Sequence, residues 1–237
     1  MIKAYITNLG KYVGGELCGE YLRLPAEKTD VQELLARIGV DGVVYEETFI
    51  TDYETDIEGL CKYMGEYESI DELNYLAGLL SDLDKHDQEK FVAAIEYGEY
   101  TDSVKKLINL THNLDNYDFI PDVEDRDDLG RYFVDEMGML EVPENLQHYF
   151  DYEAYGRDVD LDINGVFSRD LGGYIYENND RYTEHYNGRD DIPDVCKIFA
   201  YPDPPDKMPI KQQLEMFGKM ITEPMKEKLT PALDERC

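Results

Sequence analysis

The sequence predicts an α+β protein, with three successive small domains (α+β, helical, α+β) and a C-terminal extension that carries one amphipathic helix. Three observations support this prediction. Apolar residues alternate near the start as in a half-buried strand, recur at helical spacing from residue 70 to about residue 112, and give way to a proline-rich stretch after residue 201. We expect the domain boundaries to be 1–62, 63–112, 113–179 and 180–237.

The first domain is predicted as a ββαβ unit. Residues 2–6 and 16–24 read as strands on either side of the Gly14-Gly15 turn, and residues 43–52 as a third strand. Thr29 and Asp30 are expected to cap the helix that lies between the second and third strands. Gly39 is expected to end it.

The middle domain is predicted to be helical. Ser69 and Glu72 have the spacing of a capping box, and Leu73, Leu76, Ala77 and Leu80 follow at helical spacing. A second helix is expected at 87–97. Thr101 and Asp102 are expected to cap a third helix, which contains Val104, Leu107 and Ile108.

The third domain is predicted to return to α+β structure. Asp127 and Asp128 lead a helix that Gly138 closes, and Pro143 starts another whose apolar face carries Leu146, Tyr149 and Phe150. Residues 172–176 read as a closing strand. Beyond Asn179 the prolines indicate a linker, and one helix is expected with Ile210, Leu214, Phe217 and Ile221 on one face.

The composition is strongly acidic, which excludes two classes of partner. The chain has 53 acidic and 23 basic residues, a net charge of −30. Binding to nucleic acid or to an anionic membrane through a basic face is excluded, because both need clustered Lys and Arg. Hydrophobic residues make up 42%, including 20 Tyr, so we expect a folded chain rather than a disordered one.

Residues 1–180 hold 42 acidic and 14 basic residues, a net charge of −28, whereas residues 181–237 hold 11 and 9, a net charge of −2. The acidic character therefore belongs to the first three predicted domains. No apolar stretch approaches the length of a membrane span, and the first residues follow a strand pattern, so we expect no signal peptide. The four scattered cysteines predict free thiols in a reducing cytoplasm.

The segment from Asp160 to Gly165 fits the first half of a calcium-binding EF-hand loop. Asp160, Asp162 and Asn164 would supply oxygen ligands, but the twelfth position is Leu171 instead of the bidentate Glu. The alternative is an acidic Asn-Gly turn between two strands, which we favour. We expect no metal and no cofactor, since the four His also lack zinc-binding spacing.

No catalytic motif stands out in the sequence. It has no GxSxG, no P-loop and no GxGxxG after a strand. Acid pairs such as Asp127 and Asp128 could serve as acid and base, but 53 carboxylates produce such pairs by chance. We therefore predict a binding protein and not an enzyme.

The carboxylates themselves are the candidate site. They recur every few residues and could imitate duplex DNA, which carries one negative charge per roughly 1.7 Å of axis. The alternatives are a merely soluble surface, or a surface for some other basic partner. The candidate partner-binding residues are Asp52, Glu54, Asp56, Glu58, Glu66, Glu68, Asp71, Glu72, Asp115, Asp118, Asp122, Glu124, Asp125, Asp127, Asp128, Asp151, Glu153, Asp158, Asp160 and Asp162.

Two stretches resemble the ArdA antirestriction family. One runs from Leu140 to Asp158 and contains Phe-Asp-Tyr-Glu-Ala-Tyr-Gly-Arg-Asp; the other runs from Ala4 to Tyr12, with Gly15, Glu16, Leu17 and Gly19 after it. The resemblance covers about residues 1–178. Residues 180–237 lie outside the family's usual pattern.

The resemblance implies an elongated, acidic, three-domain homodimer, encoded on mobile elements, that mimics DNA. Such proteins block type I restriction–modification enzymes by occupying the DNA-binding groove, and they dimerise through the third domain. By this resemblance the motif lies near the dimer contact, with Tyr149, Phe150 and Tyr155 as structural residues. The motif residues are Leu146, Tyr149, Phe150, Tyr152, Ala154, Tyr155, Gly156 and Arg157.

Overall fold

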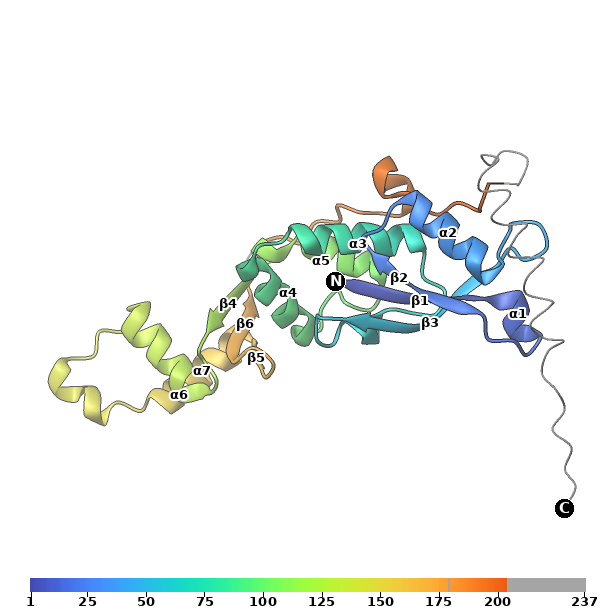
Figure 1. Ribbon diagram of the computed structural model, residues 1–237. Helices are drawn as coiled ribbons and strands as arrows, with labels where there is room; N and C mark the ends of the chain where they lie inside the picture. Colours follow the sequence, from blue (N-terminus) through green and yellow to red (C-terminus); the bar gives the residue numbers. More distant parts are fainter. Residues whose placement is uncertain (179, 204–237) are drawn as a thin grey trace, which may run out of the picture.

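Two three-stranded antiparallel sheets organise the chain, and helices lie between and beyond them (Figure 1). The computed structural model describes residues 1–178 and 180–203 of the 237. It is a mixed α+β structure that extends from the first sheet, through a group of helices, to a second sheet and a distal helix pair (Figure 1).

The first sheet has the order β2-β1-β3 and carries helix α2. Its central strand β1 (Ile2–Asn8) pairs with β2 (Gly19–Leu24) and β3 (Thr48–Thr55). Alternate residues of β1 are buried in the same core as the apolar face of α2 (Lys28–Ile38). Gly39 ends α2 in the left-handed conformation, as predicted.

Several helix and strand boundaries in this region differ from the predicted ones because of local hydrogen bonds. The prediction of Thr29-Asp30 as the cap of α2 is wrong, because Glu27 caps it and Asp30 returns a bond to the Glu27 amide. The third strand begins later than predicted because the Asp41 carboxylate folds the following residues into a turn. A short helix, α1 (Leu9–Val13), follows the Asn8 cap and was not predicted.

Three helices follow the first sheet, in the order predicted. They are α3 (Ile70–Asp82), α4 (Lys85–Tyr97) and α5 (Val104–Thr111), after the short helix η1 (Leu60–Tyr63). The predicted capping box at Ser69 is wrong, since the Ser69 side chain makes no capping bond. Helix α5 is capped by Ser103 rather than by Thr101 and Asp102.

One apolar core joins the first sheet to these helices. It includes Ile6 of β1, Leu35 of α2, Leu76 of α3, Phe91 of α4 and Leu107 of α5, all with almost no exposed surface. The first two predicted domains therefore share a single core. The division of the chain into three domains remains a prediction.

The second sheet has the order β4-β6-β5 and lies between two helical layers. Its strands are β4 (Tyr117–Pro121), β5 (Val166–Ser168) and β6 (Gly173–Glu177), after the short helix η2 (Leu114–Asn116). Tyr117 and Ile175 pack into the large core on the side of α4, and Tyr174 contributes to a small core with Leu129 on the other side. The closing strand predicted at 172–176 is confirmed.

The distal end contains α6 (Arg126–Arg131), the π-helical turn η3 (Tyr132–Glu136), η4 (Glu144–Tyr149) and α7 (Tyr152–Ile163) (Figure 1). The helix predicted to start at Pro143 is only the 3-10 segment η4, and it buries no residue. Leu146 and Tyr149 are 49% and 86% exposed, so they are not the buried face that the spacing predicted.

Residues 181–201, which we call the C-terminal strap, run back from the second sheet along the helices to the first sheet (Figure 1). The strap includes the short helices η5 (Arg189–Asp191) and η6 (Asp194–Cys196). Tyr186, Ile192 and Ile198 belong to the large core. The strap therefore packs on the body, and the domain boundary predicted at residue 180 remains a prediction. The helix predicted at Ile210–Ile221 lies outside the described residues.

In the described part of the chain, no helix combines the length and the apolar composition that a membrane crossing needs.

Candidate partner-binding surface

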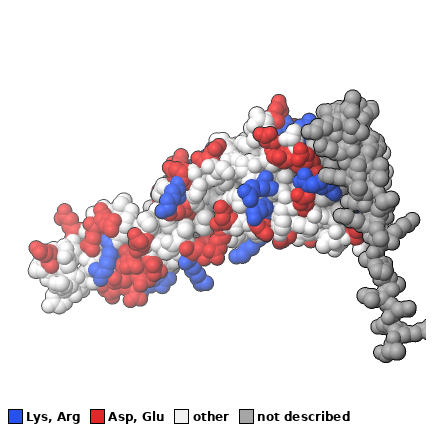
Figure 2. Space-filling model, in the orientation of Figure 1, with Lys and Arg blue, Asp and Glu red and all other residues white. Residues whose placement is uncertain are grey.

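Acidic side chains recur along the whole length of the visible face, with fewer basic side chains between them (Figure 2). Most of the carboxylates predicted to bind a partner are exposed. They come from the strands β3 and β4, from η2, from α7 and from the loops between the elements. The exposed members are Asp52, Glu54, Asp56, Glu58, Glu66, Asp115, Asp118, Asp122, Glu124, Asp125, Asp151, Glu153, Asp158 and Asp162.

Strand β3 presents its acidic residues on the sheet face that points away from the core. Asp52 and Glu54 lie opposite Tyr5 and Lys3 of β1, and the alternation of the strand places them on one face. Lys3 Nζ lies 2.6 Å from Glu54 Oε2, and this bond lowers the pKa of the Glu54 carboxyl. Tyr21 donates a hydrogen bond to Asp52, which fixes the orientation of that carboxylate.

The loop from β4 into α6 contains many acidic residues, and the start of a helix favours them because its free amides donate hydrogen bonds to acidic side chains there. Asp125 caps α6 by accepting from the Asp128 amide at 3.0 Å, and Asp128 accepts from the Glu124 amide at 3.2 Å. Asp127 forms an ion pair with Arg131 at 2.6 Å. Asp122 and Glu124 keep exposed side chains beside them. The carboxylates also lie at the positive end of the helix dipole.

Helix α7 adds a further acidic row. Asp151 caps it through the Ala154 amide at 3.0 Å, and Asp158 pairs with Arg157 at 3.2 Å. Asp160 is half-buried, accepting from Arg126 at 3.0 Å and from the Tyr174 hydroxyl at 2.8 Å. Glu153 and Asp162 are exposed. Asp160 therefore ties α7 to α6 and to the second sheet.

Two further predicted surface residues, Asp71 and Glu72, are also structural. Asp71 is 6% exposed, and its carboxylate accepts from the amides of Ile198 and Phe199 at 2.8 and 2.7 Å and pairs with Arg189 at 2.9 Å. Glu72 accepts from the Tyr186 hydroxyl at 2.7 Å. Including Asp71 in the surface was wrong, because spacing along a helix does not reveal that a distant segment covers it.

The calcium alternative has no loop to support it. Residues 160–163 are the last turn of α7, and Asn164 ends that helix in the left-handed conformation. The predicted turn between two strands is also wrong, because the Asn-Gly pair ends a helix. Within residues 1–178 and 180–203, no three His, Cys, Asp or Glu side chains are grouped to hold a metal ion.

The segment resembling the antirestriction motif contains η4 and the first part of α7, the helix that packs on α6. Tyr152 is buried, its hydroxyl donates to Asp135 at 3.2 Å, and the Arg131 guanidinium lies 4.3 Å from the centre of its ring. Gly156 lies against Gly130, where both helix backbones approach closely. Phe150 packs edge-on against the Tyr152 ring, whereas Tyr149 points to solvent, contrary to the expectation that it is structural.

The loop between α6 and α7 exposes several large apolar side chains. An open cavity of about 490 Å³ lies beneath it, lined in part by Val134, Val142 and Pro143. An apolar cluster on a charged surface is typical of a protein contact site. Its exposed members are Met137, Met139, Leu140, Leu146 and Tyr149.

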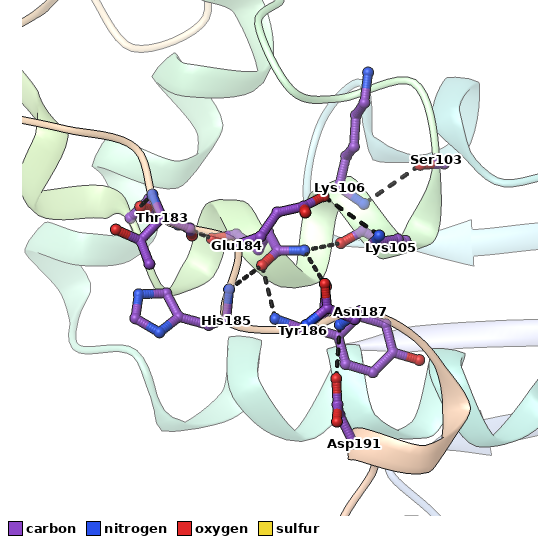
Figure 3. A network of polar contacts seen from close by, with 11 residues as sticks. Ser103, Lys105, Lys106, Thr183, Glu184, His185, Tyr186, Asn187 and Asp191 are labelled. Atoms are coloured by element: carbon purple, nitrogen blue, oxygen red, sulfur yellow. Dashed lines mark hydrogen bonds and ion pairs between the residues drawn. The ribbon is translucent and has the colours of Figure 1, made fainter.

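A polar network that the sequence did not reveal joins residues 183–187 of the strap to α5 (Figure 3), and Asn109 is at its centre. Its Oδ1 accepts from the amides of His185 and Tyr186 at 2.8 and 2.9 Å, and its Nδ2 donates to the carbonyls of Tyr186 and Lys105 at 2.7 and 3.1 Å. Asn113 repeats the arrangement with Thr183. These side chains fasten the strap to α5.

The family model described as "Antirestriction protein (ArdA)" matches residues 4–176, which include the first sheet, the helices, the second sheet and the α6–α7 pair. The strap lies outside the matched region. None of the curated proteins compared with this sequence matches it. The match over most of the chain shows that this protein belongs to the ArdA family of antirestriction proteins.

Proposed function

We propose that this protein inhibits type I restriction–modification enzymes by occupying their DNA-binding groove, with its carboxylates in the place of DNA phosphates. It binds and does no chemistry. The observation that carries the proposal is the run of exposed carboxylates from β3 to α7 on an elongated molecule (Figure 2). A groove that binds DNA presents Lys and Arg to phosphates, and carboxylates can meet the same side chains.

Most of these carboxylates keep their charge available for a partner. Among the residues that the structure describes, eleven of the exposed candidates form no ion pair with Lys or Arg. The basic groups of a partner could therefore approach these carboxylates without displacing a Lys or Arg side chain of the protein itself. They are Asp52, Glu58, Glu66, Asp115, Asp118, Asp122, Glu124, Asp125, Asp151, Glu153 and Asp162.

The proposed active form is a homodimer joined through the distal end. The exposed apolar side chains between α6 and α7, including Leu146 and Tyr149, support this choice of contact. Burying them between two copies would leave the acidic faces of both copies open. A dimer would also double the length of the acidic surface, which suits a partner that binds long duplexes.

The test is a cleavage assay with a type I enzyme, combined with direct measurement of inhibitor binding. We expect inhibition to be competitive with DNA. Raising the salt concentration from about 50 mM to about 200 mM should weaken binding to the enzyme at least tenfold, because the attraction between exposed charges is screened.

Serum albumin at the same concentration, another acidic protein, serves as the control and should not inhibit. Two results would contradict the proposal: an inhibitor affinity that stays constant across this salt range, or inhibition that excess DNA does not relieve.

A further inference from the structure

Three aromatic rings form a continuous cluster at one end of the first sheet. Tyr12 comes from α1, Phe49 from β3 and Tyr67 from the loop between η1 and α3. The centre of the Phe49 ring lies 5.0 Å from that of Tyr12, edge-on, and 6.3 Å from that of Tyr67, in a stacked arrangement. Phe49 is buried, whereas Tyr12 is 50% and Tyr67 74% exposed. We call these three residues the aromatic platform.

The Phe49 ring lies on the face of the first sheet that points away from the core. Phe49 pairs with Thr7 across the sheet, and Asp52 pairs with Tyr5. Thr7 and Tyr5 are alternate residues of β1, so both pairs share one face. Ile50, the residue after Phe49, belongs to the large core on the other face. The Asp52 carboxylate is therefore on the same face of the sheet as the platform.

Backbone hydrogen bonds hold together the three segments that carry the rings. The Leu9 amide of α1 donates to the Glu47 carbonyl at 3.1 Å, which joins α1 to the start of β3 (Figure 1). The Ile50 amide of β3 donates to the Glu66 carbonyl at 2.7 Å, which holds the loop of Tyr67 along β3. The rings are thus preorganised, and a ligand that contacts them would not have to order these segments.

Exposed carboxylates lie close to the platform. Each of its rings has one within four residues along the chain, in addition to Asp52 on the same sheet face. Among the residues that the structure describes, none of these four carboxylates forms an ion pair. They are Glu16, Glu47, Asp52 and Glu66.

The basic side chains of α1 and of this sheet face lie elsewhere. Lys11 of α1 reaches towards the end of α2, where its Nζ lies 3.7 Å from Cys18 Sγ. Lys3 and Arg23 face each other across β1 and β2, at the opposite end of the sheet from Phe49. The platform is therefore an aromatic surface in acidic surroundings, which attracts a cation.

Aromatic rings beside carboxylates suit the side chain of arginine. The planar guanidinium stacks on a ring while it pairs with a carboxylate, and it is less strongly hydrated than the lysine ammonium. The chain already contains this arrangement: Arg131 lies 4.3 Å from the centre of the Tyr152 ring and pairs with Asp127 at 2.6 Å. A second copy would bring another acidic face and a nucleic acid would bring phosphates, so both would be repelled.

We propose that the aromatic platform binds arginine side chains of a protein partner and prefers arginine to lysine. The proposal rests on the proposed function for the kind of partner, since a DNA-binding groove presents such side chains. The platform adds a choice between the two cations, which carboxylates alone make only weakly. A peptide tests this choice separately from any enzyme.

Nuclear magnetic resonance of the full chain tests the preference. The probes are the peptides Gly-Arg-Gly-Arg-Gly and Gly-Lys-Gly-Lys-Gly, which carry equal charge, at about 100 mM salt to screen distant carboxylates. The amide signals of residues 12 and 67 report binding at the platform. We expect the arginine peptide to shift these signals and to bind there at least about threefold more tightly than the lysine peptide.

Two double variants separate the effect of the rings from that of the nearby charges. Tyr12→Leu/Tyr67→Leu keeps apolar side chains but removes the aromatic faces, so the preference for arginine should disappear. Tyr12→Phe/Tyr67→Phe is the matched control, because it keeps both rings and should keep the preference. Circular dichroism shows that each variant stays folded, as expected for exposed positions.

The cleavage assay extends the test to the proposed partner. The leucine variant should inhibit at least about threefold more weakly than the phenylalanine variant, with the same salt dependence because no charge is lost. If the unaltered protein failed to inhibit, the proposed function would be wrong, and the peptides would still decide whether the platform selects arginine.

Four results would overturn the proposal. They are equal binding of the two peptides at residues 12 and 67, no shift there with either peptide, an arginine preference that survives in the leucine variant, and equal inhibition by the two double variants when the unaltered protein inhibits. Signals of residues 12 and 67 that change on dilution without peptide would assign the platform to a second copy and would overturn it as well.

Discussion

At the scale of single residues, two glycines set how closely α6 and α7 approach. A Cβ on Gly156 would lie 1.9 Å from the Arg126 carbonyl oxygen, and one on Gly130 would lie 2.0 Å from the Tyr152 carbonyl oxygen. Neither neighbour can move aside, because both are backbone atoms. We expect Gly156→Ala to lower the free energy of unfolding of the distal helix pair by about 1–3 kcal/mol, the usual cost of overpacking.

Hydrogen exchange of the α6 and α7 amides measures this loss, and Gly78→Ala provides the control. Gly78 is also helical, in α3, but a Cβ there would meet no atom within 4 Å. That change should stabilise the protein by about 0.5–1 kcal/mol, since alanine restricts the unfolded chain. Equal effects of the two changes would show that close helix packing is not the reason for Gly156.

At the scale of elements, the strap is held by an Asn side chain whose oxygen accepts hydrogen bonds from backbone amides and whose nitrogen donates to backbone carbonyls. Asn109→Asp preserves the shape but replaces the Nδ2 donor by an acceptor that faces the carbonyls of Tyr186 and Lys105. We expect this substitution to destabilise the protein by at least about 2 kcal/mol, because buried acceptors would oppose each other. Urea denaturation measures it, and the exposed Asn145→Asp should change stability by less than about 0.5 kcal/mol.

Truncation separates the strap from the rest of the C-terminal region. A chain ending at Asn178 loses the buried side chains of Tyr186, Ile192 and Ile198 and leaves the Asp71 carboxylate without its partners. Its melting temperature should fall by more than about 10 °C, the effect of losing several kcal/mol. A chain ending at Asp203 should melt close to the full chain, and similar melting of both truncated chains would contradict the structural role of the strap.

The elements that the sequence predicted well are those whose apolar residues repeat regularly. The buried faces of α2 and α3 were identified because buried residues recur at helical spacing. Val31 and Leu34 show this spacing in α2, and Leu73 and Leu76 show it in α3. The strap could not be predicted, because it is mostly polar and its contacts, such as Asn109 with Tyr186, join residues far apart in the chain. Caps were misplaced for a related reason: several Ser, Thr and Asp residues compete at each helix start.

The candidate surface was predictable only in outline. Charge counts locate the acidic character, but they do not separate an exposed acid such as Asp122 from a buried one such as Asp71. Likewise, helical spacing gave Tyr149 a buried role, whereas the chain around it forms a 3-10 segment that buries none of its residues.

At the scale of the whole molecule, DNA mimicry requires that the position of charge matters as well as its amount. Asp115, Asp118, Asp122 and Glu124 lie along one stretch, from the end of the helices to α6, and form no ion pair among the described residues. Replacing any one by its amide should weaken enzyme binding less than about fivefold, since single exposed ion pairs contribute up to about 1 kcal/mol.

Replacing all four together should weaken binding far more, at least about thirtyfold, and should flatten its salt dependence, because the contributions of separated surface charges add. The matched variant removes the same number of charges from the strap and its end, at Glu184, Asp190, Asp194 and Asp203, which lie outside the region shared with the family. It should inhibit almost as well as the unaltered protein. If the two quadruple variants lost affinity equally, net charge alone would account for inhibition, and the proposed imitation of a phosphate row would be wrong.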